Sequence, residues 1–491
     1  MGSSSTYLEL QQICLSATQD INRPVVINDA TIEGRQRDRA SFSQVTNSIT
    51  QINVCTRLTN TSPHPILVGE GFMAKVKRLN DALSKAVIHI VDNWWEDDAS
   101  GYRSRMPLDS HQEAVLKWVH QQSRNGSMRP FKDSMGHFRP DLVLTDGDDS
   151  LTVPFRVCEI NCRNPFNAIL SSVYRYETVS RLLKPPVAVQ PAADWEGMVE
   201  DLFTLFDPSL PIHLVAGRDE MSREDFTSLA HRRTGLCPRI IKLSDLRLEP
   251  DASSQTDYAL YCSYQDAGDQ ETKLERIHQA VPLLFADEFC QLSYHLLCHL
   301  AFVAVNDFRS ILLLDDKRLL GIVRQEAEAL SDIGILTPQQ AILLKEAIVP
   351  TILPRSQELE HIVHSYREGK ISKGDFIFKP WSLSRGNGHL LGETLSAQEW
   401  EQHLLNMQGL DLSTTDNTLY LLQPYIKQPT FRLYLEDDTK HTDTYMVGTY
   451  HAVNGRFVGL GTWRTGPGRI CTGFSSGNVP LISVIAADIG R

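Results

Sequence analysis

Apolar residues recur at spacings of three and four over one long stretch in the first third of the chain. This spacing is typical of one face of an α-helix, and it predicts a helix from Phe72 to about Trp95. The apolar positions of the stretch are Phe72, Val76, Leu79, Leu83, Val87, Ile90 and Val91. Residues 1–65, which precede it, are polar and rich in Ser, Thr, Asn and Gln.

Two short runs further along the chain have the composition of β-strands. They span 141–144 and 155–160, and the turn-forming residues 146–149 lie between them, so we predict a β-hairpin. Glu159 and Asn161 are two residues apart, and such a hairpin would direct both side chains to the same face.

From about residue 185, helical patterns alternate with short apolar runs, which is typical of a doubly wound α/β fold. The runs are 212–216, 239–243 and 258–262, and a helical pattern from Phe289 to Val305 leads out of the segment. We predict an α/β (α+β) chain in which a small doubly wound domain is inserted. The chain would then have three parts, 1–184, 185–306 and 307–491, of which the second is the inserted domain.

The last part begins with the apolar run 311–314 and a predicted helix from Asp316 to Leu330. A strand at 375–379 then leads into a loop that contains two glycines. Residues 419–457 are typical of several strands, with hairpin turns at Asp437-Asp438 and Asn454-Gly455.

Composition and charge narrow the class of protein. The net charge of −12 argues against nucleic acid as the main partner, because phosphate backbones need a basic surface. Nine cysteines without a CxxC pair indicate a reduced, cytoplasmic protein, and the lack of any run of about 18 apolar residues predicts no membrane span. Residues 1–6 fit a loose pattern for myristoylation of Gly2, although a polar disordered start or a remnant of an expression vector explains them better.

The strand at 375–379 ends in Lys379, and the loop after it contains Gly386 and Gly388. Glycines let backbone N–H groups approach phosphate oxygens, and a lysine at a strand end would reach the same phosphates. The loop is neither a Walker A sequence nor the GxGxxG of dinucleotide folds. Taken alone it is better explained as a surface turn, so its interpretation depends on the other segments.

Two further segments would complete a nucleotide site. Lys317 begins a predicted helix, where the helix N-terminus and the lysine favour a bound anion; an exposed lysine in the first turn is the alternative. The apolar run 419–426, interrupted by Pro424, would offer backbone groups to an adenine edge; an ordinary buried strand is the alternative.

The predicted hairpin places two oxygen-bearing side chains on one face. Glu159 and Asn161 suit Mg²⁺, which takes one or two protein groups and keeps phosphates and water as its other ligands. A surface carboxylate beside a turn-forming Asn is the alternative. Arg139, at the start of the partner strand, would clamp a carboxylate bidentately.

His295 and His299 stand at helical spacing with Cys298 between them, a pattern that allows a zinc site. The glutamate of the HExxH motif is absent, so a buried helix explains them better.

The order of these segments resembles that of eukaryotic glutathione synthetase, the circularly permuted branch of the ATP-grasp superfamily. In that family an Arg-x-Asp strand is followed by a Glu-x-Asn strand, as Arg139-Pro-Asp141 is followed here by Glu159-Ile-Asn161. A substrate-binding domain, a phosphate lysine, a Lys-Pro strand end with a glycine loop, an adenine hinge and an arginine loop come next in the family. They correspond to 185–306, Lys317, Lys379 through Gly388, 423–426 and 463–465.

The resemblance implies an ATP-grasp fold and a role for each matching residue. ATP would be bound by Lys317, Lys379, Ser384, Arg385, Gly386, Asn387, Gly388, Gln423, Tyr425 and Ile426. Glu159 and Asn161 would hold Mg²⁺, whereas Arg139 and Arg464 would hold the acceptor's carboxylate and the acyl-phosphate. The resemblance also implies a homodimer.

The chain departs from the family's pattern at several positions. Leu383 stands where the family has a metal-binding glutamate, and Glu393 is a candidate replacement. Gly466 stands where the family has a second basic residue, for which Arg469 would substitute. The family's late glycine stretch appears only as 475–478, so glutathione is not to be assumed as the product.

Together these features predict an ATP- and Mg²⁺-dependent ligase that joins a carboxylate to an amine through an acyl-phosphate, with small amino-acid or peptide-like substrates. The alternatives are a kinase on the same fold and a non-catalytic nucleotide-binding protein.

Overall fold

The computed structural model describes most of the 491-residue chain. The described residues are 10–18, 23–49, 60–146, 154–163, 166–184, 187–218, 223–265, 271–383, 386–409, 419–471 and 478–487. Gly2, the predicted turn from 147 onward, Ser384, Arg385 and residues 475–477 lie outside them.

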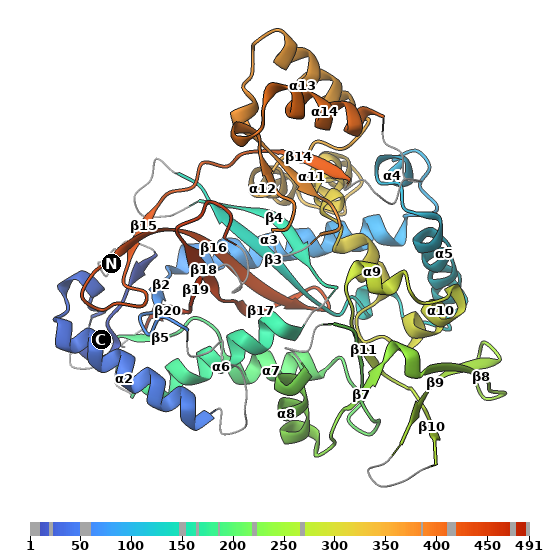
Figure 1. Cartoon of the computed structure of the whole chain (residues 1–491), viewed down its shortest axis with the longest axis horizontal. Helices are drawn as coiled ribbons and strands as arrows, with labels where there is room; N and C mark the ends of the chain where they lie inside the picture. Colours follow the sequence, from blue (N-terminus) through green and yellow to red (C-terminus); the bar gives the residue numbers. More distant parts are fainter. Residues whose placement is uncertain are drawn as a thin grey trace.

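A seven-stranded antiparallel sheet forms the centre of the molecule (Figure 1). Its strands follow the order β19-β18-β16-β3-β4, and two more strands, β15 and β17, pair with β16. The bounds are β3 His137–Leu144, β4 Phe155–Asn161, β15 Phe431–Leu433, β16 Thr442–Val453, β17 Arg456–Leu460, β18 Trp463–Gly466 and β19 Val479–Leu481. The predicted hairpin at 141–160 is confirmed as β3 and β4, which pair antiparallel.

The turn between β16 and β17 is formed by Asn454 and Gly455, as the sequence predicts. Both residues have positive φ, 44° and 76°, which an Asn-Gly pair adopts at little cost.

The predicted helix after residue 70 is α3, Glu70–Asp92, which buries its apolar face against the central sheet. The ring of Phe72 lies 5.0 Å from Phe155 of β4 and 5.9 Å from Trp463 of β18, so the start of this helix packs on the central sheet. Helices α11 (Lys317–Asp332) and α12 (Pro338–Ala347) pack with α3. A second group consists of α2 (Ile32–Ile49), α6 (Phe166–Leu182) and α7 (Trp195–Phe203).

The polar N-terminal region folds onto the C-terminal part of the chain. Arg39 binds both carboxylate oxygens of Asp438 at 2.7 and 2.8 Å, and the buried His64 ring lies 3.1 Å from the same carboxylate. Asp438, which was predicted as part of a hairpin turn, is therefore buried and holds α2 through its ion pair with Arg39. A small sheet, β1-β2-β20-β5, joins the two ends of the chain. Its strands are β1 Gln11–Gln12, β2 Ile66–Leu67, β5 Val189–Pro191 and β20 Ser483–Ala486.

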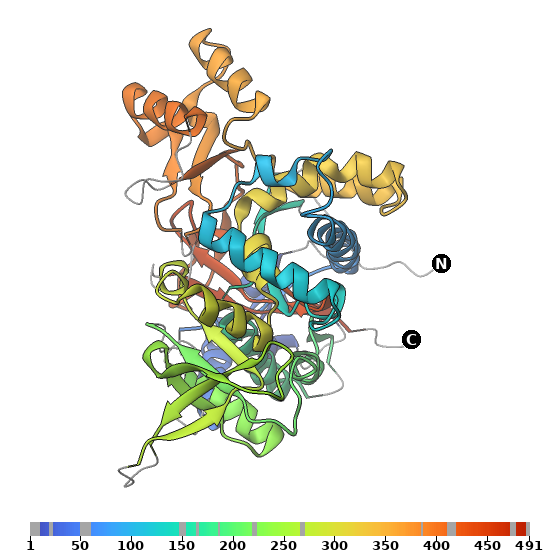
Figure 2. The same ribbon diagram turned by 90° about the vertical axis from the view of Figure 1, so that its right-hand side faces the viewer.

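The middle of the chain forms a separate unit, which Figures 1 and 2 show at one end of the molecule. In the parallel sheet β11-β6-β7, helix α8 forms the crossover between β6 and β7, so the alternation of helix and strand predicted for this part of the chain is present there. The run 258–262, in contrast, lies in a second, antiparallel sheet, β10-β9-β8, because its connections contain no crossover helix. The bounds are β6 His213–Ala216, α8 Arg223–Thr234, β7 Arg239–Lys242, β8 Leu246–Pro250, β9 Tyr258–Tyr264, β10 Lys273–Arg276 and β11 Ala280–Leu283.

At the opposite end lies a small subdomain with one three-stranded sheet, β13-β12-β14 (Figures 1 and 2). Its strands are β12 Phe376–Pro380, β13 Leu390–Leu391 and β14 Tyr420–Pro424. Helices α13 (Gln357–Arg367) and α14 (Ala397–Gln408) cover one face. Phe378 and Leu422 pack with Trp400 on that face, so Lys379, the next residue of the strand, projects from the other face.

The remaining helices are short or connect these units. They are α1 Leu15–Thr18, α4 Tyr102–Arg105, α5 Ser110–Arg124, α9 Ala286–Phe289, α10 Tyr294–Val303 and a π-helix, Ser310–Leu314. Short 3₁₀ turns lie at Ile27–Asp29, Phe131–Asp133, Leu243–Asp245, Lys373–Asp375 and Gly392–Thr394. Within the described ranges, none of the helices has the length and apolar character needed to traverse a bilayer.

Candidate active site

Glu159 and Asn161 lie on β4 directly opposite Asp141 and Arg139 of β3. Asn161 Nδ2 lies 3.4 Å from Glu159 Oε1, so the two side chains are neighbours on one face, as predicted. A β-bulge between Asp141 and Leu142 shifts the register just beyond this pair. Bulges often re-aim side chains near functional sites.

A short extended segment, 348–352, connects the central sheet to the small subdomain. The amide of Val349 donates to Val157 of β4 at 3.0 Å, and the amide of Ile352 donates to Leu422 of β14 at 2.8 Å. The strand that contains Glu159 is thereby linked through one segment to the sheet that contains Lys379.

Lys317 is the first residue of α11, whose N-cap Asp316 accepts a hydrogen bond from the Arg318 amide at 2.9 Å. The Lys317 ammonium lies 3.5 Å from Glu159 Oε2 and donates to the carbonyl of Leu383 at 2.7 Å. Only 6% of Lys317 is exposed, so it is not the solvent-facing lysine of the alternative interpretation. Lys317 therefore contacts both the Glu159 carboxylate and the start of the glycine loop.

The electrostatics of Glu159 follow from these neighbours. Burial alone would raise the pKa of its carboxyl, but the charges of Lys317 and Lys379 reverse the shift and lower it. Glu159 is therefore an anion in a half-buried, cationic environment. Burial, reinforced by Lys379, lowers the pKa of His389 to about 3, which keeps this imidazole neutral.

The glycine loop is the connection between β12 and β13, which pair antiparallel. Gly386 and Gly388 have φ values of 70° and 72°, a left-handed conformation that favours glycine. At the start of the loop, the carbonyl of Trp381 accepts from the amide of Lys317 at 3.3 Å, and the Arg318 guanidinium lies 3.8 Å from the Trp381 ring centroid. The N-terminus of α11 thus docks onto the loop.

Sequence reasoning missed a second connection to this loop. Asp315 accepts from the amides of Cys162 and Arg163 at 2.8 and 3.0 Å and pairs with the Arg163 guanidinium at 2.9 Å. Arg163 also donates to the carbonyl of Ser382 at 3.1 Å. The only feature of the sequence that could have indicated a role for Arg163 at this site is its position two residues after Asn161.

Arg139 and Arg464 meet at one buried carboxylate. Arg139 Nε donates to Asp141 Oδ1 at 2.9 Å, and Arg464 pairs with Asp141 Oδ2. Burial alone would lower the pKa of Arg464, but the charge of Asp141 raises it overall. Sequence reasoning named both arginines but gave no role to Asp141, which fixes their positions.

The predicted adenine segment lies on β14 and just after it. Gln423 is buried and donates to Thr351 Oγ1 at 3.0 Å, and the amide of Tyr425 donates to the carbonyl of Asp375 at 2.7 Å. The Tyr425 amide is therefore engaged within the subdomain. Leu421, which pairs with Lys379, supplies apolar surface on the same face as the lysine.

The proposed replacements for missing family residues pair with each other. Glu393 forms an ion pair with Arg469, and Leu383 is 39% exposed. A Cβ on Gly466 would stand 1.9 Å from Asn478 Oδ1, so a side chain at position 466 would require the Asn478 side chain to move. Residues 295–299 lie in α10, where Cys298 is buried and His299 binds the His295 carbonyl at 2.9 Å and Thr256 at 3.2 Å.

The fold and the arrangement of these segments define the class of protein: the chain belongs to the ATP-grasp enzymes. It is 36% identical over 491 residues to the "ATP-grasp enzyme ankG" of Aspergillus thermomutatus, a match that covers 96% of this chain and 99% of the relative. The family model of the AnkG N-terminal domain matches residues 79–313. The predicted family is therefore confirmed, and the chain is an enzyme of the ATP-grasp superfamily.

A solved structure shows the same fold. The glutathione synthetase-like effector of Globodera pallida, in its apo form, superposes with a TM-score of 0.50 at 9% sequence identity. The match covers 91% of this chain and 97% of the effector. The predicted fold class is confirmed by this similarity.

Proposed function

We propose that the protein is an ATP- and Mg²⁺-dependent ligase that joins a carboxylate to an amine through an acyl-phosphate. Its substrates would be small amino-acid or peptide-like molecules. The observation that supports this most strongly is the convergence of Lys317 on Glu159, 3.5 Å apart, with Lys379 contributing its charge from the second sheet. Such a set suits a triphosphate and its metal ion.

The two lysines and the glycine loop would bind the phosphates. Lys317 and Lys379 are both buried, which strengthens their attraction for phosphate oxygens relative to exposed lysines. Gly386 and Gly388 leave the backbone of the loop open to close approach. Lys317 would exchange its contact with the Leu383 carbonyl for a phosphate oxygen.

The donor set fits Mg²⁺. Glu159 offers an ionised carboxylate, and the neighbouring Asn161, whose Nδ2 lies 3.4 Å from Glu159 Oε1, would offer its Oδ1. Both are hard oxygen ligands of the kind that Mg²⁺ takes from proteins. When bound, the ion would offset negative charge on the phosphates during transfer. Leu383 cannot contribute a ligand, so phosphates and water would fill more of the coordination shell.

The arginines would act on the acyl group. In the first step, the substrate carboxylate oxygen would attack the γ-phosphorus, and ADP would leave as the acyl-phosphate forms. The amine would then attack the acyl carbon, phosphate would leave, and the amine would lose a proton to give the amide. Arg464 and Arg139, which both contact Asp141, would bind carboxylate and oxyanion oxygens.

The loop from 381 to 389 would exclude water, which otherwise hydrolyses an acyl-phosphate. It is attached to the central sheet through Arg163 and Ser382, 3.1 Å apart, and to α11 through Lys317.

We also propose, from the family resemblance, that the protein is a homodimer. A reducing, cytoplasmic setting would suit the described cysteines, all of which are free.

The substitution by Leu383 favours one competing proposal, a protein that binds ATP without turning it over. Incubation with ATP, Mg²⁺ and a panel of amino acids and short peptides separates the possibilities. A ligase releases ADP and phosphate together with an amide product, a kinase leaves a stable phosphorylated product, and a binding protein shows no turnover. Only the first result supports the proposal.

A further inference from the structure

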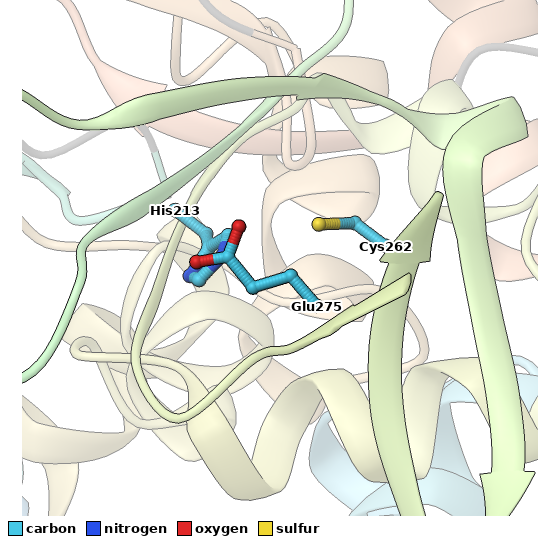
Figure 3. A group of neighbouring side chains, drawn as sticks. All are labelled: His213, Cys262 and Glu275. Carbon is cyan, nitrogen blue, oxygen red and sulfur yellow. The ribbon is translucent and has the colours of Figure 1, made fainter. Parts of the chain in front are cut away.

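Three metal-ligating side chains meet between the two sheets of the middle unit, away from the nucleotide site. His213 is the first residue of β6 in the parallel sheet, whereas Cys262 and Glu275 are direct cross-strand partners on β9 and β10. In Figure 3 the sulfur of Cys262 points toward the Glu275 carboxylate and the His213 ring, which lie together. No pattern in the sequence links these residues, because each lies on a different strand.

The three side chains are close enough to share one ion. One ligand atom from each lies within 4.8 Å of the other two, and His213 Nε2 lies 3.6 Å from Glu275 Oε1. A zinc ion, with bonds of about 2.0–2.3 Å, holds its ligands less than about 4 Å apart, so small side-chain movements would close the site.

The His213 ring points to a ligand independently of this spacing. The residue is 0% exposed, and neither ring nitrogen meets hydrogen-bond geometry with any described residue. A buried polar group without a hydrogen bond is costly to the fold. Burial lowers the pKa of His213, so the ring is in the neutral form that binds metals.

Arg239 orients the carboxylate of Glu275. It lies 2.5 Å from Oε2, and its guanidinium stacks 3.7 Å from the ring centroid of Tyr264. This contact occupies one carboxylate oxygen and leaves Oε1 directed to His213. An oriented carboxylate of this kind is common in the surroundings of metal sites.

We propose that His213, Cys262 and Glu275 form a site for a divalent transition-metal ion of the zinc class. Thiolate and imidazole are ligands that select such ions over Mg²⁺, and three protein ligands leave a fourth position for water or a small molecule. Binding would form a sulfur–metal bond, break the S–H bond of Cys262 and release that proton to solvent.

The test uses the full-length protein, freed of metal with a chelator and titrated with Co²⁺ and then with Zn²⁺. We expect a thiolate-to-cobalt charge-transfer band that saturates at one ion per chain and is abolished by Zn²⁺. Cys262→Ser should remove the band and lower the Zn²⁺ affinity more than about tenfold. Glu275→Gln, a milder change at a partly exposed residue, should weaken binding without loss of the band.

Cys298→Ser is the matched control, because Cys298 is also buried in the core of this unit. It should leave cobalt and zinc binding unchanged. No saturable binding by the wild type, an unchanged band in Cys262→Ser, or equal loss in Cys298→Ser would each overturn the proposal. The site is independent of the proposed ligase activity, so neither result decides the other.

Discussion

The ammonium of Lys317 lies 3.5 Å from the carboxylate of Glu159, although the two residues stand in different thirds of the chain. The contact joins the N-terminus of α11 to the β3–β4 hairpin, and Lys379 adds a second cation from the small subdomain. A lysine pair around a half-buried carboxylate is the core of the proposed site for triphosphate and metal.

Loss of charge at Lys379 or Glu159 should lower the catalytic rate strongly while the fold persists. We expect Lys379→Ala and Glu159→Gln to lower kcat by about 10²–10³-fold, the usual effect of removing one stabilising group from a transition state. Binding of MgATP can be measured by calorimetry without knowledge of the substrates. Once a substrate pair is known, the rate of ADP release measures kcat. Lys370→Ala is the control, because Lys370 is 68% exposed and pairs only with Glu368 among the described carboxylates. Wild-type turnover in both site variants would reject the assignment.

Asp141→Asn should destabilise the protein as well as impair catalysis. The substitution leaves Arg139 and Arg464 without their buried partner, which typically costs about 3–5 kcal/mol. Urea unfolding measures this loss. Asp443→Asn is the comparison, because its ion pair with Arg432 is exposed and is worth less than about 1 kcal/mol. Equal stability of the two variants would show that Asp141 does not hold the arginines.

Gly448→Ala should disturb the strand that positions Arg464. A Cβ at this position would stand 2.5 Å from the Trp463 ring, so β16 and β18 would have to separate. Overpacking of this kind costs about 1–3 kcal/mol. We expect a lower melting temperature and weaker substrate binding, measured by scanning calorimetry and steady-state kinetics. An unchanged melting temperature would contradict the packing described for this strand pair.

His451 should make stability depend on pH. It is fully buried, 3.0 Å from both His137 and Ser172, and burial followed by the charge of His137 lowers its pKa. The unfolded chain, with an ordinary pKa near 6.5, then binds more protons than the folded chain. The free energy of unfolding should therefore fall as the pH drops below about 6.5, by up to about 1.4 kcal/mol per pH unit from this group.

Removal of the imidazole isolates this contribution. His451→Gln should be less stable near neutral pH, because its hydrogen bonds change, but its stability should fall less steeply toward acid. Urea midpoints at several pH values below 7 give both slopes. Parallel slopes for wild type and variant would show that His451 does not contribute.

Glu393→Gln tests whether Glu393 replaces the glutamate lost at Leu383. The ion pair with Arg469, in which both side chains are more than two-fifths exposed, gives Glu393 a partner other than a metal ion. We expect a stability change below about 1 kcal/mol and turnover close to wild type. A loss as large as that of Glu159→Gln would instead make Glu393 a metal ligand.

The local elements of the site could be predicted from the sequence. The spacing of Phe72, Val76 and Leu79 indicated α3, the Asn454-Gly455 pair indicated a hairpin, and the alternation at Glu159 and Asn161 indicated a shared face. Each of these features depends on residues close together in the chain, where periodicity and turn chemistry are sufficient.

Contacts between distant segments could not be predicted in the same way. The role of Asp141 depends on its contact with Arg464, which lies on the distant strand β18. The role of Arg163 likewise depends on its contacts with Asp315 and Ser382, which are far from it in the chain. The buried cluster of His213, Cys262 and Glu275 depends on how two sheets pack, which no local pattern encodes.

A crystal structure with Mg²⁺ and a non-hydrolysable ATP analogue tests the central claim most directly. We predict the metal at about 2.1 Å from a Glu159 oxygen, with Lys317 and Lys379 on the phosphates and the adenine against β14. A nucleotide bound elsewhere would contradict the account. One such place is the cleft of about 440 Å³ that Gly321, Thr351 and His361 line on the α13 side of the subdomain.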